Sequence, residues 1–205
     1  DGTLLDTLGD LTAAMNRTLT RHGLPERTRQ QMRAALGNGA RRLMELSIPA
    51  GTDGALFETL LAEYNADYAA HCRIETAPYP GVDALLRQLH AQGRKLAIVS
   101  NKPDEAVRAL RAEFFADTVP IAVGEKQGIR RKPAPDTLLT AMVQLGAERT
   151  STVYVGDSEV DIATARAAGL PCISVLWGFR DRDMLEQAGA QQFAADAGEL
   201  ARLLD

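Results

Sequence analysis

Residues 153–175 read VYVGDSEVDIATARAAGLPCISV, and this stretch decides the fold. It joins two short apolar runs, Val153–Val155 and Cys172–Val175, through a segment that favours a helix over 162–168. An apolar run, a helix and a second apolar run predict a β-α-β unit with parallel strands. Neither run alternates apolar with polar residues, which is typical of strands covered on both faces. The stretch therefore predicts an α/β fold.

The same alternation of apolar runs and helical segments extends toward the N-terminus. It predicts strands at Leu96–Val99 and Val119–Val123 and helices at 82–92, 105–114 and 136–145. Short apolar runs separated by helices of about ten residues are typical of a parallel sheet with helices on both faces. The fold expected for this part of the chain is thus a Rossmann-like, doubly wound parallel sheet.

The chain before residue 78 has a different pattern. Residues 8–71 read as helix throughout, and no strand-like run interrupts them. The first helix carries an apolar stripe at helical spacing, formed by Leu8, Leu11, Met15 and Leu19. We therefore expect an α/β core built from residues 1–7 and 78–205, with residues 8–77 inserted as an all-helical subdomain.

Composition narrows the classes of partner. The 205 residues are 45% hydrophobic and 24% charged, and the formal net charge of -4 gives no electrostatic reason to expect nucleic acid or an anionic membrane. No apolar run approaches the roughly 18 residues of a membrane span. Cys72 and Cys172 form no metal-type or redox-type pair, and reduced, packed thiols favour the cytoplasm. Monomer and homodimer are both compatible with the sequence.

Polar residues gather where the predicted strands end. In open α/β sheets, ligands bind beyond the carboxyl ends of the strands. The residues at these positions, or in loops leading to them, are Asp1, Gly2, Ser100, Asn101, Lys132, Gly156, Asp157 and Asp161. Each has an ordinary alternative; Asp157, for example, could simply cap the following helix. Their occurrence together in strand-end order favours a binding site.

The residue types suit phosphoryl transfer. Carboxylates such as Asp157 can hold Mg²⁺, which prefers oxygen ligands. The hydroxyl and amide of Ser100 and Asn101 can donate hydrogen bonds to phosphoryl oxygens, and Lys132 supplies a positive charge for the same group. The two glycines Gly2 and Gly156 allow the backbone to approach a ligand closely.

Four segments together resemble the haloacid dehalogenase superfamily of phosphotransferases with a helical C1 cap. They are 1–7, 98–102, 131–133 and 156–161, read as DGTLLDT, IVSNK, RKP and GDSEVD. The resemblance implies that Asp1 is the acid/base that protonates the leaving group and activates water, and that its carbonyl is a Mg²⁺ ligand. It also implies an aspartate nucleophile two positions before Asp1, together with a strand that carries this nucleophile. The Asp1-Gly2-Thr3 sequence favours phosphate over carbon–halogen chemistry.

The resemblance assigns roles to the other strand-end residues. Ser100 and Asn101 match the motif that binds the transferring phosphoryl group. Lys132 matches the lysine that stabilises charge on the nucleophile and the phosphate. Asp157 matches the acidic metal ligand, and Asp161 assists directly or through water.

The helical insert bears on the substrate. Residues 36–43, LGNGARRL, resemble the cap segment of phosphoglycolate phosphatases, as does Trp177-Gly178-Phe179. Arg41, or alternatively Arg42, could reach a substrate carboxylate or second phosphate, although a solvated helix face is an equal alternative. The expected function is that of a phosphoric monoester hydrolase, Mg²⁺-dependent, acting on a small phosphorylated metabolite with 2-phosphoglycolate as the first candidate.

Three alternatives stay open at this point. The first is a beta-phosphoglucomutase-like phosphosugar mutase, which returns the phosphoryl group to a rotated intermediate instead of to water. The second is a pyrophosphatase or nucleotidase of the same fold. The third is a pseudoenzyme that binds phosphorylated ligands without turnover.

Overall fold

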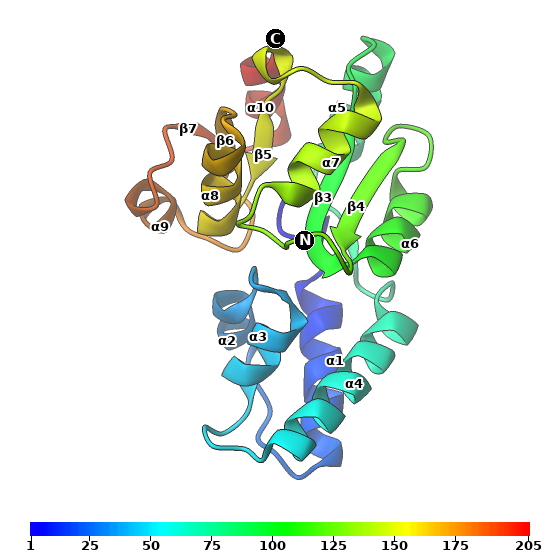
Figure 1. Cartoon of the computed structure of the whole chain (residues 1–205), viewed down its shortest axis with the longest axis vertical. Coiled ribbons are helices and arrows are strands. Elements are labelled where there is room, and N and C mark those ends of the chain that lie inside the picture. The colour runs from blue at the N-terminus through cyan, green and yellow to red at the C-terminus, as the bar shows by residue number, and fades with distance from the viewer. The chain divides into compact units, whose positions relative to one another are not determined.

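The structure is a computed structural model that describes all residues 1–205, and the chain divides into two compact units (Figure 1). The core unit comprises residues 1–5 and 78–205, and the cap unit comprises residues 6–77. Each unit has its own buried apolar residues and is described separately.

Five parallel strands form the sheets of the core unit. They are β3 (Ala97–Pro103), β4 (Ile121–Glu125), β5 (Tyr154–Gly156), β6 (Cys172–Val175) and β7 (Gln192–Ala194). Strands β3 and β4 pair in parallel, and β5, β6 and β7 form a second parallel set in that order (Figure 1). The predicted α/β class and parallel arrangement are confirmed, and β7 is an additional strand.

Helices connect and cover the strands of the core unit. They are α5 (Val82–Ala91), α6 (Asp104–Phe114), α7 (Asp136–Leu145), η1 (Arg149–Ser151), α8 (Glu159–Ala168), α9 (Arg182–Gln187) and α10 (Ala197–Leu204). Neighbouring residues of β6 pack into two different apolar clusters: Ile173 joins the cluster of α5 and α10, and Cys172 lies against that of α7 and α8. Because successive strand side chains point to opposite faces, this sheet is covered on both sides.

Four helices form the cap unit: α1 (Leu8–Arg21), α2 (Arg29–Ala35), α3 (Gly39–Ser47) and α4 (Gly54–His71). Three residues of the α1 stripe are buried as the spacing predicts, Leu11, Met15 and Leu19, and Leu8 is half-buried. Side chains cap two of the helices that follow: Thr28 forms a capping box with Gln31 at α2, and Asp53 accepts backbone hydrogen bonds at α4.

Two short strands mark the passage of the chain between the units. Strand β1 (Leu5–Asp6) pairs with β2 (Ala77–Pro78), and within the core unit the backbone N–H of Tyr79 donates to the carbonyl of Leu4 at 3.0 Å. No helix of the structure combines the length and the apolar character needed to cross a membrane. The two cysteines are free thiols.

Candidate active site

The turn between β5 and α8 is organised by one carboxylate. Oδ2 of Asp161 accepts hydrogen bonds from the backbone N–H of Asp157 at 3.2 Å and from Ser158, through its N–H at 3.1 Å and its hydroxyl at 2.6 Å. A Cβ atom on Gly156 would lie 2.3 Å from the Cβ of Asp161, so only glycine fits there. Ser158, not Asp157, is the N-cap of α8 and forms a capping box with Asp161, so the interpretation of Asp157 as a simple helix cap is wrong.

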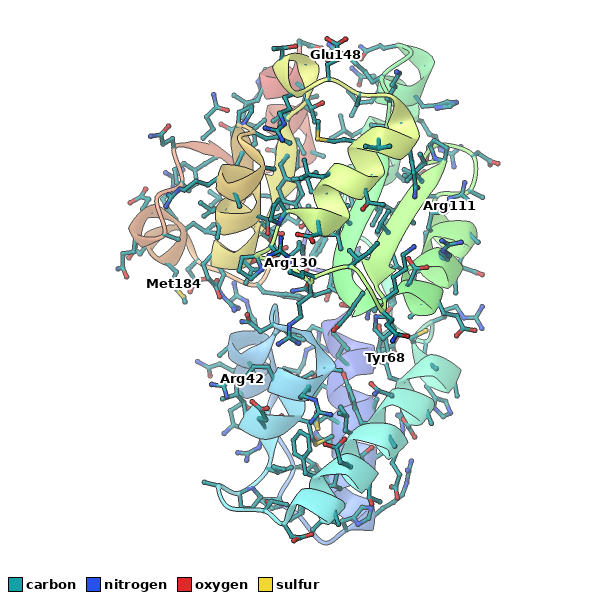
Figure 2. All side chains as sticks on the ribbon, in the orientation of Figure 1. Arg42, Tyr68, Arg111, Arg130, Glu148 and Met184 are labelled. Atoms are coloured by element: carbon teal, nitrogen blue, oxygen red, sulfur yellow. The ribbon has the colours of Figure 1, made fainter.

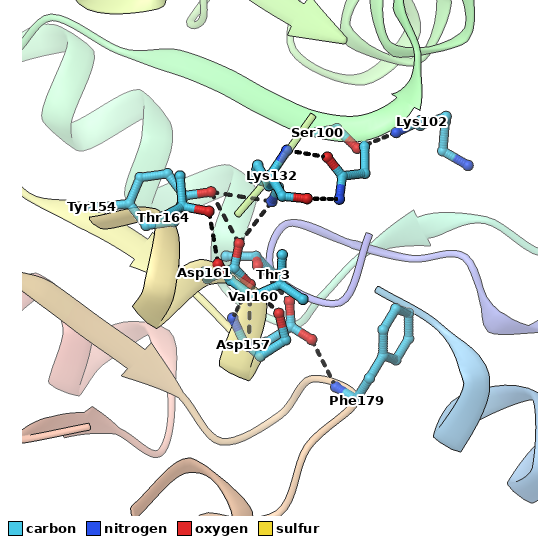
Figure 3. Close-up of polar contacts among 12 residues, drawn as sticks. Thr3, Ser100, Lys102, Lys132, Tyr154, Asp157, Val160, Asp161, Thr164 and Phe179 are labelled. Carbon is cyan, nitrogen blue, oxygen red and sulfur yellow. Dashed lines mark hydrogen bonds and ion pairs between the residues drawn. The ribbon is translucent and has the colours of Figure 1, made fainter. Parts of the chain in front are cut away.

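The other oxygen of Asp161 binds a buried lysine. Nζ of Lys132 lies 2.7 Å from Oδ1 of Asp161 and 3.1 Å from the hydroxyl of Tyr154, which itself donates to the same Oδ1 at 3.0 Å (Figure 3). Burial opposes the charge on Lys132, but attraction to Asp161 outweighs it and raises the lysine pKa. Burial likewise opposes the charge on Asp161, and the ion pair with Lys132 lowers its pKa nevertheless. Both side chains are therefore charged at neutral pH.

The loop that carries Lys132 is fastened to the end of β3. The side-chain amide of Asn101 donates to the carbonyl of Lys132 at 3.0 Å and accepts from its N–H at 2.8 Å. The hydroxyl of the neighbouring Ser100 accepts the backbone N–H of Lys102 at 3.2 Å. In this structure the Asn101 amide thus orients Lys132, a role that the sequence pattern did not suggest.

Asp157 is a buried carboxylate with two neutral hydrogen-bond donors. The hydroxyl of Thr3 donates to Oδ1 at 2.7 Å, and the backbone N–H of Phe179 donates to Oδ2 at 2.9 Å (Figure 3). No lysine or arginine forms a salt bridge with it. Burial and the nearby charge of Asp161 raise the pKa of Asp157. Its negative charge is therefore poorly balanced by the protein.

The first residues of the chain pack against Asp157 through glycines. A Cβ atom on Gly2 would lie 2.2 Å from Oδ2 of Asp157, and one on Gly178 would lie 2.3 Å from the Cβ of Asp157 and 2.5 Å from the carbonyl oxygen of Gly2. The indole N–H of Trp177 donates to the carbonyl of Thr3 at 2.9 Å. Backbone from two loops thereby approaches one carboxylate more closely than any other residue type would allow.

Asp1 is paired with a second buried lysine. Nζ of Lys102 lies 3.3 Å from Oδ1 of Asp1, and the two side chains are 7% and 21% exposed. The core unit therefore brings together Asp1, Ser100, Asn101, Lys132, Asp157 and Asp161, the residues that the sequence placed at strand ends.

Comparison with known proteins identifies the family. The family model described as "Haloacid dehalogenase-like hydrolase" matches residues 1–175. The chain belongs to this family. A phosphoglycolate phosphatase of Xanthomonas campestris is 35% identical over 88% of this chain and 81% of its own length. An N-acetylmuramic acid 6-phosphate phosphatase of Pseudomonas aeruginosa is 30% identical over 100% of this chain and 92% of its own length.

Solved structures agree with this membership. The crystal structure described as a putative phosphoglycolate phosphatase from Lactobacillus delbrueckii has a TM-score of 0.94 and is 37% identical, covering 100% of this chain and 95% of its own. The resemblance drawn from the four sequence segments is confirmed, and the chain is a phosphoglycolate phosphatase-like hydrolase of the haloacid dehalogenase-like family.

Sequence reasoning missed three polar partners in this haloacid dehalogenase-like hydrolase. Tyr154 reads as part of an apolar run two residues before Gly156, and its hydroxyl is the only feature that indicates a polar role. Thr3 and Lys102 lie within the recognised segments without an assigned function. Their contacts with Asp157 and Asp1 come from elements far apart in the chain.

Arg41 belongs to the cap unit of this haloacid dehalogenase-like hydrolase. Its guanidinium forms two hydrogen bonds with Glu58 of α4, at 2.8 and 2.9 Å, and lies 5.1 Å from the ring centroid of Phe57. Arg42, labelled in Figure 2, pairs with Glu45 on the same helix at 2.9 Å. Both arginines are about half exposed and held in place by a carboxylate of their own unit.

Replacing Gly2 with Ala is expected to inactivate this haloacid dehalogenase-like hydrolase. The added methyl group would displace the Asp157 carboxylate, and a displacement of about 1 Å at a catalytic group costs on the order of 100-fold in rate. Gly93→Ala is the matched control, because φ is +73° at Gly2 and +75° at Gly93, and nothing lies within 4 Å of a Cβ on Gly93. Turnover and thermal melting of both variants test this; equal activity in the two would contradict it.

Proposed function

We propose that this protein hydrolyses a small phosphate monoester through an aspartyl-phosphate intermediate, with Mg²⁺ as cofactor and 2-phosphoglycolate as the first candidate substrate. The nucleophile in this proposal is the aspartate that the family resemblance places two positions before Asp1. The observation that carries the proposal is the Asp157 carboxylate, buried without a lysine or arginine salt bridge beside the Lys132–Asp161 ion pair. A buried charge without a partner is costly, and a divalent cation at this carboxylate would remove the cost. The names of the relatives at 35% and 30% identity support the same chemistry.

The donor set suits Mg²⁺ better than a metal held by protein ligands alone. No group of three His, Cys, Asp or Glu side chains that could hold a metal gathers in the chain. Mg²⁺ is commonly bound by one or two carboxylates and completes its shell with waters and phosphate oxygens. Asp157 and the carbonyl of Asp1 are the ligands we propose, with Asp161 acting through water because both its oxygens already accept protein hydrogen bonds. When bound, the ion neutralises charge on the phosphoryl oxygens.

The protein's own groups account for the proton transfers. As the aspartyl nucleophile bonds to phosphorus, the ester P–O bond breaks and Asp1 gives its proton to the departing alkoxide. Asp1, now a carboxylate, takes a proton from the water that attacks phosphorus, and the acyl–phosphate bond breaks to return the nucleophile. Lys132 stabilises the charge on the phosphoryl oxygens, and Ser100 with the backbone at Asn101 donates hydrogen bonds to the same group.

A second candidate substrate follows from one of the relatives. The Pseudomonas aeruginosa protein, whose similarity spans 100% of this chain, is named for N-acetylmuramic acid 6-phosphate. This compound and 2-phosphoglycolate share two features, a phosphate monoester and a carboxylate. The shared carboxylate supports the proposal that an arginine of the cap unit contributes to substrate selection, because guanidinium binds carboxylates in a bidentate manner.

A phosphate-release assay on the full-length protein tests the proposal. The substrates are 2-phosphoglycolate, N-acetylmuramic acid 6-phosphate and β-glucose 1-phosphate, each with Mg²⁺ and with a chelator. We expect Mg²⁺-dependent release of inorganic phosphate from at least one of the first two. Interconversion of glucose phosphates without phosphate release would identify a mutase instead, and binding without turnover a pseudoenzyme.

Replacing Arg41 with Ala is expected to raise KM for the carboxylate-bearing ester about tenfold, the loss of one charge-assisted contact. KM for p-nitrophenyl phosphate should stay nearly unchanged, because that ester has no carboxylate. Arg42→Ala, measured alongside, shows which of the two arginines acts. Arg87→Ala is the control, since Arg87 forms a similarly exposed pair with Asp83 in the core unit. Equal changes for both esters would count against a role of Arg41 in specificity.

A further inference from the structure

Lys102 is a charged residue in the active site to which the family resemblance assigned no role. Its side chain is 7% exposed, and its ammonium lies 3.3 Å from the carboxylate of Asp1. Lysines are rarely buried unless they are paired, because removing an ammonium group from water is costly. Here the partner is Asp1, the group that the proposed function uses as acid and base.

The backbone at Lys102 is closely packed, in the stretch of β3 where the register with β4 shifts between Val99 and Pro103. The hydroxyl of Ser100 accepts its N–H at 3.2 Å, and a Cβ on Gly124 of the neighbouring strand would lie 2.7 Å from its carbonyl oxygen. The carboxylate of Asp104, two residues on, accepts the N–H of Gly124 at 2.8 Å. Strand β4 and the start of α6 thus fix the point from which the lysine side chain extends.

The two buried lysines of the site have different carboxylate partners. Lys132 pairs with Asp161 at 2.7 Å, and Lys102 pairs with Asp1 at 3.3 Å. Lys132 is thereby held beside the β5–α8 turn, and Lys102 is the lysine that contacts the Asp1 carboxylate. The Asp1 side chain is 21% exposed and can adopt more than one staggered rotamer, and the Lys102 ammonium at 3.3 Å favours the one that makes this ion pair.

We propose that Lys102 is a positioning residue that holds the Asp1 carboxyl in the orientation for proton transfer to the leaving group and from water. The inference rests on the proposed function. If Lys102 positions Asp1, its replacement should slow most the hydrolysis of esters whose leaving group needs a proton. An alkyl ester such as 2-phosphoglycolate needs a proton on its departing oxygen, whereas p-nitrophenolate departs without one.

First-turnover kinetics of Lys102→Met in the full-length protein test this. We expect release of glycolate from 2-phosphoglycolate to slow about 100-fold, at the lower end of general-acid contributions, with KM within about twofold. Release of nitrophenolate in the first turnover should change less than about threefold. The following turnovers should be slow, because hydrolysis of the aspartyl-phosphate still needs Asp1 as base. Lys102→Arg should restore part of the glycolate rate.

The ratio of the two first-turnover rates is measured on one preparation, so it does not depend on the fraction of folded enzyme. Lys95→Met is the matched control, because Lys95 is an exposed lysine that donates to the carbonyl of Gly146. Adding Lys102→Met to Asp1→Asn should cause little further loss, since residues that act through one another are not additive.

Three results would overturn the inference. They are an equal loss for both esters, a fully additive loss in the double variant, and an Arg variant no faster than the Met variant. Failure of the proposed function is distinguishable, because the wild-type protein would then release phosphate from neither ester.

Discussion

Replacing Asp157 with Asn is expected to lower Mg²⁺-dependent turnover by about 100- to 1000-fold, while leaving the metal-free protein as stable as the wild type or more so. The activity falls because the proposed metal loses its buried carboxylate ligand, and electrostatic stabilisation of this kind contributes on the order of 10²–10³ per donor. The amide of Asn can still accept from Phe179 and donate to Thr3, the two groups that bind Asp157 now.

The stability prediction follows from the raised pKa of Asp157. A carboxyl whose folded-state pKa is raised contributes stability below its unfolded pKa, and that contribution is lost as the pH rises through the folded pKa. Without metal, the wild-type protein therefore carries this cost at neutral pH, and Asp157→Asn does not.

Thermal melting with and without Mg²⁺ measures both effects. The wild type should gain stability with Mg²⁺ concentration, as binding linkage requires, and Asp157→Asn should not. Asp196→Asn, at the exposed N-cap of α10, is the control and should respond to Mg²⁺ as the wild type does. A variant that still gains stability with Mg²⁺ would show that Asp157 is not a ligand.

Replacing Lys132 with Met is expected to reduce turnover about 100- to 1000-fold, because a positive charge beside the phosphoryl group is lost. It should also destabilise the fold by about 3 kcal/mol, because removing one partner leaves a buried charge uncompensated. Asp161 would keep its hydrogen bonds from Ser158 and Tyr154 but lose its only salt bridge. Lys95→Met, at an exposed position, is the matched control and should change stability by less than about 0.5 kcal/mol.

The destabilisation by Lys132→Met should depend on pH. The pKa of Asp161 is lowered in the fold, so its contribution to stability is present above the unfolded pKa and is lost as the pH falls through the folded pKa. The variant should therefore differ most from the wild type at neutral pH, and the difference should begin to shrink only below about pH 4, the ordinary pKa of Asp. Urea unfolding across this range measures the difference.

A double variant separates the structural from the chemical role of Lys132. Adding Asp161→Asn should recover much of the stability lost in Lys132→Met, because the buried charge is gone, but should recover none of the activity. A Lys132→Met variant as stable as the wild type at pH 7 would contradict the ion-pair argument.

The strands that were predicted from the sequence could be recognised for one physical reason. Runs such as Val153–Val155 are buried on both faces and are continuous in apolar residues, which makes them recognisable. Strand β7 was missed because Gln192 is exposed and Phe193 half-buried, so its place in the sheet depends on backbone pairing with β6. Strand β3 also continues to Pro103, beyond the expected end at Val99, through polar residues that read as a loop.

The positions of the candidate site residues in the fold were predictable, but their partners were not. Asp157 follows β5 and Lys132 lies in the loop before α7, as the order of apolar runs and helices predicted. The bond between Asn101 and Lys132 joins residues 31 positions apart, and the bond between Thr3 and Asp157 joins residues 154 apart. Such contacts depend on the packing of separate elements, which no local pattern records.

The hydrogen bond between the N–H of Tyr79 and the carbonyl of Leu4 has a consequence for how this chain can diverge. It lies next to the β1–β2 pair, where the two ends of the inserted segment meet, and none of the parallel strand pairs of the core unit includes a residue of the segment. The entropy of closing such a segment grows only with the logarithm of its length. Lengthening or exchanging the insert therefore leaves the register of the parallel strands untouched, so this segment can diverge in length and sequence while the sheet that carries the candidate site residues stays the same.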